Sequence, residues 1–112
     1  MRRLIVAGLG PLLAVLLVAT SVGAAPDTGS PHVVATIAVG RGPIGVAVDS
    51  TTDLIYVANS GSSTVSVING ATNRVVATVS VGGLPEGVAV DSTTDLIYVT
   101  NNRSGTVSVI RG

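Results

Sequence analysis

The sequence of 112 residues contains no cysteine, no phenylalanine and no tryptophan. Without cysteine the chain can form neither a disulfide nor a thiolate metal site, and it cannot carry a c-type haem or a lipid on cysteine. Stability must therefore come from packing, from internal repeats or from partners. Histidine occurs once, at His32, and one imidazole falls short of the three or more ligands that a mononuclear metal site needs.

Lysine is also absent, and six arginines balance six acidic residues, so the formal net charge is zero. Two of the arginines lie within the first three residues, and the chain from residue 25 onward carries a net charge of −2. A basic patch with interleaved aromatic residues is missing, so nucleic-acid binding is not expected.

The start of the chain has the layout of a secretory signal peptide. Two arginines precede an apolar run over residues 4–19, and the small residues that follow predict cleavage after Ala24. An uncleaved membrane anchor is the alternative, but the run of 16 residues is shorter than the ~20 that a spanning helix needs, and Pro11 would kink it. We therefore predict a signal-peptide helix over residues 1–24, a linker over residues 25–32 and a secreted, extracytoplasmic product. Membrane contact is expected only through an uncleaved leader.

From residue 33 the sequence repeats at an offset of 42 residues. Residues 33–70 and 75–112 are identical at 28 of 38 positions. A fixed period of this length indicates stacked or radially arranged units. The chain after the linker accordingly divides into two units, 33–74 and 75–112.

Each unit is predicted to contain four short strands, because the segments between turn residues are rich in Val, Ile, Thr and Tyr. In the first unit the predicted strands cover residues 33–39, 46–49, 54–59 and 64–68. Apolar residues occur on both faces of these strands, which fits sheets stacked against neighbouring sheets. The sequence thus predicts an all-β protein of two four-stranded antiparallel blades of the β-propeller type.

The segment Tyr56-Val57-Ala58-Asn59 and its repeat Tyr98-Val99-Thr100-Asn101 resemble the motif that names the YVTN-type β-propeller repeat. The similarity extends over nearly all of residues 33–112. It implies an exported cell-envelope protein related to surface-layer proteins and to the haem d1 domain of cytochrome cd1. It does not imply a reaction, because propellers carry many functions.

The resemblance also implies a ring of about seven blades, within the usual range for propellers, whereas this chain holds two repeats. Two interpretations stay open. The chain is either a fragment of a larger propeller, or a subunit that associates with further copies of itself to complete one. In a closed ring, residues 33–39 could complete the blade that ends the chain.

The motif residues themselves are given structural roles. Tyr56 and Tyr98 are expected to pack between sheets. Asn59 and Asn101 end their strands and are expected to cap the following turns through hydrogen bonds to the backbone.

Two pairs of carboxylates flank identical Ser-Thr-Thr triplets, namely Asp49 with Asp53 and Asp91 with Asp95. Such pairs could hold Ca²⁺, although a calcium loop normally offers more carboxylates and a glycine at its bend. The favoured interpretation is a hairpin turn in which Asp and Ser side chains bond nearby amides. The four residues are weak metal candidates, and the sequence assigns no cofactor and no catalytic residue.

Positions at which the repeats differ are the candidates for recognising a partner, because loops commonly carry function. Ile44 is replaced by Glu86 in the second repeat, and Arg41 and Arg103 each stand where the other repeat has glycine.

The leading hypothesis is a non-enzymatic, exported β-propeller-repeat protein that acts as a binding or structural module at the cell envelope. Its partner would be an envelope protein or further copies of the same chain. The alternative is a remnant of an enzymatic or redox propeller of the haem d1 or lactonase type, although the chain lacks a second histidine as a haem ligand.

Overall fold

The computed structural model describes residues 29–112. The predicted signal-peptide helix and the first part of the linker lie outside these residues. The chain divides into two units, Met1–Val34 and Ala35–Gly112, and both sheets belong to the second unit. No helix of residues 29–112 is long and apolar enough to cross a membrane.

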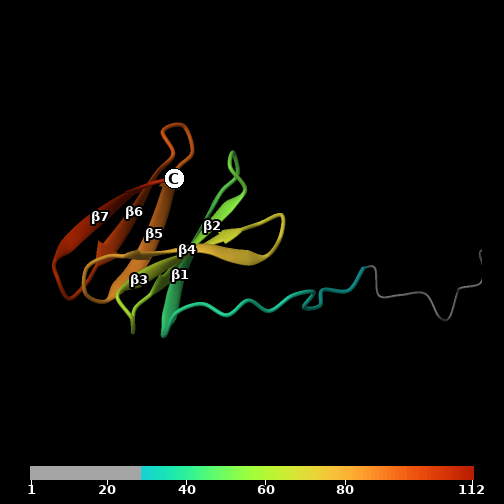
Figure 1. Ribbon diagram of the computed structural model, residues 1–112, viewed down its shortest axis with the longest axis horizontal. Helices are drawn as coiled ribbons and strands as arrows, with labels where there is room; N and C mark the ends of the chain where they lie inside the picture. The colour runs from blue at the N-terminus through green and yellow to red at the C-terminus, as the bar shows by residue number, and fades with distance from the viewer. Residues whose placement is uncertain (1–28) are drawn as a thin grey trace, which may run out of the picture. The chain divides into compact units, whose positions relative to one another are not determined.

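Within residues 29–112, seven antiparallel strands form two sheets, as the all-β prediction requires (Figure 1). The first sheet, here called blade 1, contains β1 (Pro43–Asp49), β2 (Leu54–Asn59), β3 (Thr64–Asn69) and β4 (Arg74–Ser80). The second sheet, blade 2, contains β5 (Pro85–Asp91), β6 (Leu96–Asn101) and β7 (Thr106–Arg111). In both blades each strand pairs with the strand before it, so each blade is a simple meander.

The prediction of two four-stranded blades is correct for blade 1 and wrong for blade 2, which has three strands among the described residues. The predicted strand over residues 33–39 is absent as well. These residues belong to neither sheet, and Val33 and Val34 are largely exposed.

The phase of the repeat explains both differences. The strand β4 opens the second sequence repeat, yet it pairs with β3 and completes blade 1. Blade 1 therefore takes its fourth strand from the second repeat. Blade 1 spans residues 43–80 and crosses the boundary between the units 33–74 and 75–112.

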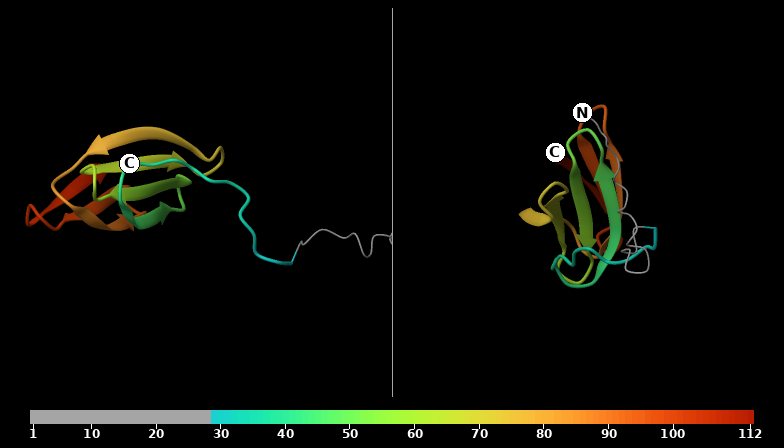
Figure 2. Two further views of the ribbon diagram at one scale, coloured as in Figure 1. Left: turned by 90° about the horizontal axis from the view of Figure 1, so that it is seen from below. Right: turned by 90° about the vertical axis from the view of Figure 1, so that its right-hand side faces the viewer.

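The core lies where one face of blade 1 meets one face of blade 2, and the views in Figure 2 show the two sheets against each other. Tyr56, Val65 and Val67 of blade 1 contact Ile97 and Val99 of blade 2, and all five side chains are buried. Side chains alternate along a strand, so each blade commits only one of its two apolar faces to this core.

The backbones of the two blades approach each other closely at Gly45 in β1. A Cβ atom placed there would collide with the carbonyl oxygen of Glu86 in β5. The strands β1 and β5 can approach this closely because position 45 has no side chain.

Candidate interaction surface

The turns β1–β2 and β5–β6 hold the four carboxylates that the sequence singled out. Oδ1 of Asp49 accepts hydrogen bonds from the amide of Thr51 at 3.0 Å and from its hydroxyl at 2.7 Å. Asp91 accepts the equivalent bonds from Thr93 at 3.0 and 2.6 Å. These bonds favour the charged carboxylate, so the threonine hydroxyl in each turn lowers the pKa of its aspartate.

The other two aspartates, Asp53 and Asp95, close their turns in the left-handed conformation, with φ of 59° and 57°. Aspartate adopts this conformation more readily than most residues. The hydroxyl of Thr51 lies 3.5 Å from Oδ1 of Asp95, so the two turns are neighbours. Within residues 29–112, however, no three His, Cys, Asp or Glu side chains are placed to share a metal ion. The hydrogen bonds around these carboxylates are those of hairpin turns.

Near these turns the structure buries two oxygen atoms that have no hydrogen-bond partner among the described residues, Oδ2 of Asp49 and the hydroxyl of Tyr56. Burial raises the pKa of Tyr56, and the negative charges of Asp49 and Asp95 raise it further. The Tyr56 hydroxyl is therefore neutral at pH 7, and its burial costs free energy because it gives up its hydrogen bonds to water on folding.

The motif asparagines have partners that the sequence interpretation did not foresee. Nδ2 of Asn59 donates to the hydroxyls of Thr64, at 3.2 Å, and Ser66, at 3.0 Å. Asn101 makes the equivalent two bonds in blade 2, at 3.1 and 2.9 Å. The asparagines are buried, and these bonds link β2 to β3 and β6 to β7 through side chains, whereas backbone caps were expected.

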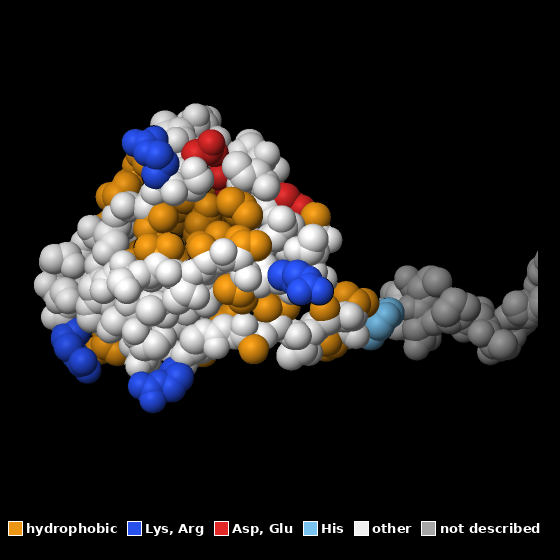
Figure 3. All heavy atoms as spheres, in the orientation of Figure 1, with side chains coloured by type: hydrophobic (Ala, Val, Ile, Leu, Met, Phe, Trp, Pro, Cys, Tyr) orange, Lys and Arg blue, Asp and Glu red, His pale blue; other side chains and the backbone are white. Residues whose placement is uncertain are grey.

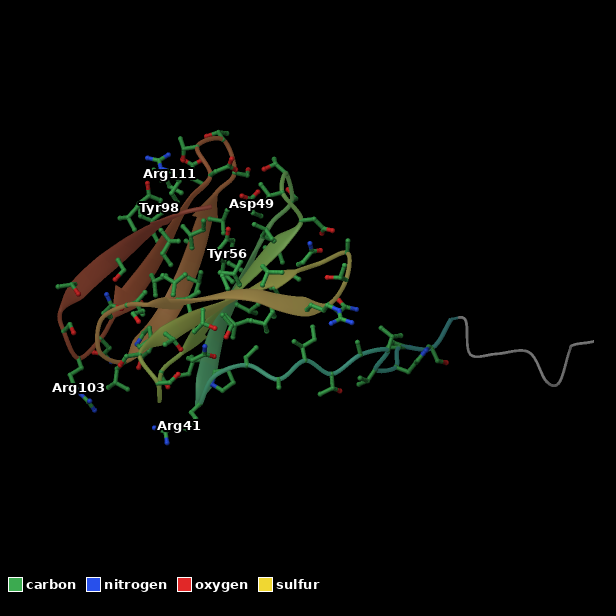
Figure 4. All side chains as sticks on the ribbon, in the orientation of Figure 1. Arg41, Asp49, Tyr56, Tyr98, Arg103 and Arg111 are labelled. Atoms are coloured by element: carbon green, nitrogen blue, oxygen red, sulfur yellow. The ribbon has the colours of Figure 1, made fainter. Side chains whose placement is uncertain are left out.

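The interaction candidates Arg41 and Arg103 lie at the same end of the two blades, opposite the end that holds Asp49 (Figure 4). Arg41 packs against the loop residue Gly61: Nη2 of Arg41 donates to the carbonyl of Gly61 at 3.0 Å, and the amide of Gly61 donates to the carbonyl of Arg41 at 2.9 Å. In blade 2 the amide of Arg103 donates to the carbonyl of Gly83 at 3.0 Å.

The arginine–glycine differences at positions 41 and 83 and at positions 61 and 103 are therefore one exchange. In each blade, the two loops that contact each other hold one arginine and one glycine. A Cβ atom at Gly61 would lie 3.3 Å from the Cβ of Arg41, so the pair has little room for a second large side chain. The sequence itself contains this signal. From the first repeat to the second, arginine becomes glycine at one position, and glycine becomes arginine 20 residues later.

The remaining candidates, Ile44 and Glu86, occupy equivalent positions at the start of β1 and β5. Ile44 is exposed, whereas Glu86 accepts a hydrogen bond from Nδ2 of Asn102 at 3.2 Å. Glu86 also borders an open hollow of about 400 Å³ on blade 2. The hollow is lined by Glu86, Thr100, Asn101, Asn102, Gly105, Thr106 and Val107.

Each blade also exposes an apolar face, of which Ile44 alone was among the interaction candidates predicted from the sequence. On the face shown in Figure 3, hydrophobic side chains gather between the sheets, with arginines at the margin. Apart from Val75 and Val76 of β4, the exposed large apolar residues of the strands fall into two groups, which we call face 1 and face 2. Face 1, on blade 1, comprises Ile44, Val46 and Val48; face 2, on blade 2, comprises Tyr98, Val107 and Val109. The signal in the sequence was the apolar character of both strand faces in a chain with only two repeats.

Comparisons with known proteins agree with the architecture. A family model for the NHL repeat matches residues 41–68, and no curated protein matches the chain. A solved structure of Kuenenia stuttgartiensis hydrazine synthase resembles the chain with a TM-score of 0.61 and 25% sequence identity, over 78% of this chain and 24% of that one. The chain thus spans about a quarter of the length of this structural neighbour.

The strand order, the stacked sheets and these similarities define the class of the protein: it is built from β-propeller repeats. Within that class, the repeat for which a family model is matched is the NHL repeat, over residues 41–68 of blade 1.

Proposed function

We propose that this chain is an exported, non-catalytic β-propeller-repeat protein that serves as a binding or structural module at the cell envelope. The observation that carries the proposal is the exposure of the apolar faces 1 and 2. Val46 and Val107, one from each face, are 63% and 55% exposed. Contiguous apolar surface of this kind marks sites where a protein contacts a partner.

The polar groups support a structural role. Asp49 and Asp91 have lowered pKa values and bond the hydroxyl groups of their own turns, so they are ionised near pH 7 and are poor proton donors. Asn59 and Asn101 are engaged with hydroxyls of the neighbouring strand. In each case the same arrangement occurs in both blades, as expected of groups that hold a repeat together.

Export and the envelope location are supported by the sequence. The leader has the charge, apolar length and small-residue pattern of a signal peptide. Kinship with YVTN-type surface-layer propellers is supported by the segments that end at Asn59 and Asn101. The partner of such a module is an envelope protein or another copy of the chain.

A second proposal is that the chain is the remnant of an enzymatic or redox propeller. In its favour stands the similarity to a chain whose name, hydrazine synthase, is that of an enzyme. The match spans 24% of that chain, so it supports a shared fold more strongly than a shared reaction.

The experiment that tests export is expression from Met1 in a bacterial host, followed by mass measurement of the product in each cell fraction. We expect an extracytoplasmic product that begins at Ala25 and is retained with the envelope. A product that keeps Met1 and stays in the cytoplasm would contradict the proposal. A variant with Arg2 and Arg3 replaced by glutamate serves as the control, because it removes the positive charge of the leader without changing the blades.

A further inference from the structure

We propose that a second copy of this chain docks on blade 2 in a head-to-tail manner and repeats the contact that blade 2 makes with blade 1. The inference rests on the proposed function and names one partner of the proposed module. Two separate features of blade 2, its exposed face and its unpaired edge, accept the same second copy.

The first feature is face 2. Tyr98, Val107 and Val109 are the repeat equivalents of Tyr56, Val65 and Val67, which form the blade 1 side of the core. The two faces thus carry the same apolar side chains in the same register. In blade 1 this face is covered by blade 2, and in blade 2 it is exposed.

Face 1 supplies the complementary half. Val46 and Val48 are the equivalents of Val88 and Val90, which pack against the core from the blade 2 side. Pro85, at the start of β5, is buried, whereas the equivalent Pro43 is exposed. Through Val46 and Val48, face 1 of one copy therefore presents to face 2 of another the same valines that blade 2 presents to blade 1, whereas Ile44 stands where blade 2 has Glu86.

A glycine supports the same geometry. Within the chain, Gly45 allows the backbone of β1 to approach Glu86 and Gly87. The next contact of this kind would bring Gly87 against the backbone at Ile44 of the second copy. Gly87 itself has no side chain in the way, but Oγ1 of Thr100 lies 2.9 Å from a Cβ placed at this position. This hydroxyl, which stands where blade 1 has Ala58, would have to move aside for such an approach.

The second feature is the edge of β7, which has no further strand beside it among residues 29–112. In blade 1 the equivalent edge, that of β3, is paired with β4. Residues 33–36, Val-Val-Ala-Thr, are identical to residues 75–78 of β4, and they lie outside both sheets. An unpaired edge strand of this kind is a template for strand addition.

The register of the added strand follows from that of blade 1. There Ser66 pairs with Thr78 and Val65 with Val79. With the offset of 42 residues, Ser108 would pair with Thr36 of the second copy, and Val107 with its Ile37. The chain then continues through Gly40 into β1 of the second copy, whose face 1 meets face 2. One copy thus makes both contacts, and because the interface is heterologous, its closure gives a ring.

The test uses two complementary variants of the full chain. Val107→Glu with Val109→Glu places charges on face 2, and Val46→Glu with Val48→Glu places them on face 1. All four side chains are more than half exposed within one chain, so each variant should fold. Ala71→Glu with Thr72→Glu is the control, since it adds the same charges at the exposed β3–β4 turn.

Native mass measurement at micromolar concentration should show a discrete oligomer for the natural chain and for the control. Each face variant alone should be a monomer, or be at least ten-fold weaker in self-association. An equimolar mixture of the two should give a 1:1 dimer, because each retains the face that the other has lost. A monomeric natural chain, an unaffected face variant or a mixture without heterodimer would each overturn the proposal.

A disulfide test addresses the edge contact, and the natural chain offers no competing thiol. A mixture of Thr36→Cys and Ser108→Cys chains should form a heterodimer under oxidising conditions. The matched control is Ser66→Cys with Thr78→Cys in one chain, which should close an internal disulfide at the equivalent pair of blade 1. If the control closes and the mixture does not cross-link, the proposed register is wrong.

These outcomes are separable from a failure of the proposed function. An exported, envelope-bound chain that remains a monomer would overturn the self-association and leave the proposed function in place. A discrete oligomer that is not exported would overturn the proposed function and leave the self-association in place.

Discussion

The two blades have nearly the same sequence and very different surroundings. Tyr56 of blade 1 is 1% exposed and Tyr98 of blade 2 is 38% exposed, although the residues around them are almost identical. Val65 and Val107 show the same contrast, at 0% and 55%. Burial in this protein is thus a property of the neighbouring blade, because a blade cannot cover its own apolar face.

The comparison reverses for the opposite faces. On that side blade 2 is covered and blade 1 is open: Val88 and Val90 are half-buried, while Val46 and Val48 are exposed. Each blade therefore has one apolar face that is covered by the other blade and one that is exposed. Substitutions at equivalent positions should consequently have different effects, and the difference between them measures what the neighbouring blade contributes.

The largest difference is expected for Tyr56→Ala against Tyr98→Ala. Removal of a buried aromatic ring costs about 3–5 kcal/mol, so Tyr56→Ala should unfold most of the chain or lower its urea midpoint drastically. Tyr98→Ala should cost about 1 kcal/mol or less, because its ring lies on an exposed face. Urea unfolding of dilute protein, followed by circular dichroism, measures both values.

The same pair of variants also reports on association. If a second copy covers face 2, the cost of Tyr98→Ala should grow with protein concentration, as mass action requires. Equal costs for both variants in dilute protein would contradict the contrast between the two environments.

The next largest difference is expected for Gly45→Ala against Gly87→Ala. The methyl group at position 45 would collide with the backbone of β5, and overpacking of this kind costs about 1–3 kcal/mol. At position 87 the nearest atom is Oγ1 of Thr100 at 2.9 Å. A shift of this side chain loses one hydrogen bond from the amide of Gly87, which costs about 1 kcal/mol. A scanning calorimeter would compare the two, and a larger loss at position 87 would contradict the assigned contact.

The sequence predicted the strands well because their signal is local. The range predicted for β2 is the one observed, and the turn between Asp49 and Asp53 was recognised from its Ser-Thr-Thr triplet. Both depend on side chains that act on their own backbone within a few residues.

The parts that could not be predicted depend on pairing between distant segments. Residues 33–39 and β4 have nearly the same sequence, yet only β4 has a strand beside it. Local propensity cannot distinguish them, because the difference lies in whether an edge is within reach. The partners of Asn59 and the contact of Arg41 with Gly61 could not be predicted for the same reason. Each joins two different strands or loops, and local propensity does not say which segments pair.

A smaller effect is expected at high pH for Tyr56→Phe. The pKa of Tyr56 is raised above its ordinary value of 10.0, so the folded state binds a proton that the unfolded state loses between these two values. Stability should be complete below pH 10.0 and should fall as the pH rises through the folded value. Tyr56→Phe should abolish this loss, because it removes the group whose pKa is raised.

At pH 7 the Tyr56→Phe chain should be as stable as the natural chain or about 1 kcal/mol more stable, because the hydroxyl that it removes is buried without a hydrogen-bond partner among residues 29–112. Thermal unfolding between pH 7 and pH 11 measures both effects. A marked destabilisation at pH 7 would show that the hydroxyl has a partner.

The smallest effect is expected at low pH for Asp49→Asn and Asp91→Asn. The pKa of each carboxyl is held below its ordinary value of 3.8 by the threonine hydroxyl of its turn. Each carboxylate therefore contributes stability above pH 3.8 that is lost as the pH falls through the folded value. Each asparagine variant should show a flatter decline of the melting temperature over this range, since its amide oxygen still accepts from the threonine and no longer titrates. Because both turns make the same bonds, the two variants should behave alike, in contrast to the tyrosine and glycine pairs. A flattening at only one position would mean that the neighbouring blade, and not the turn itself, sets the pKa.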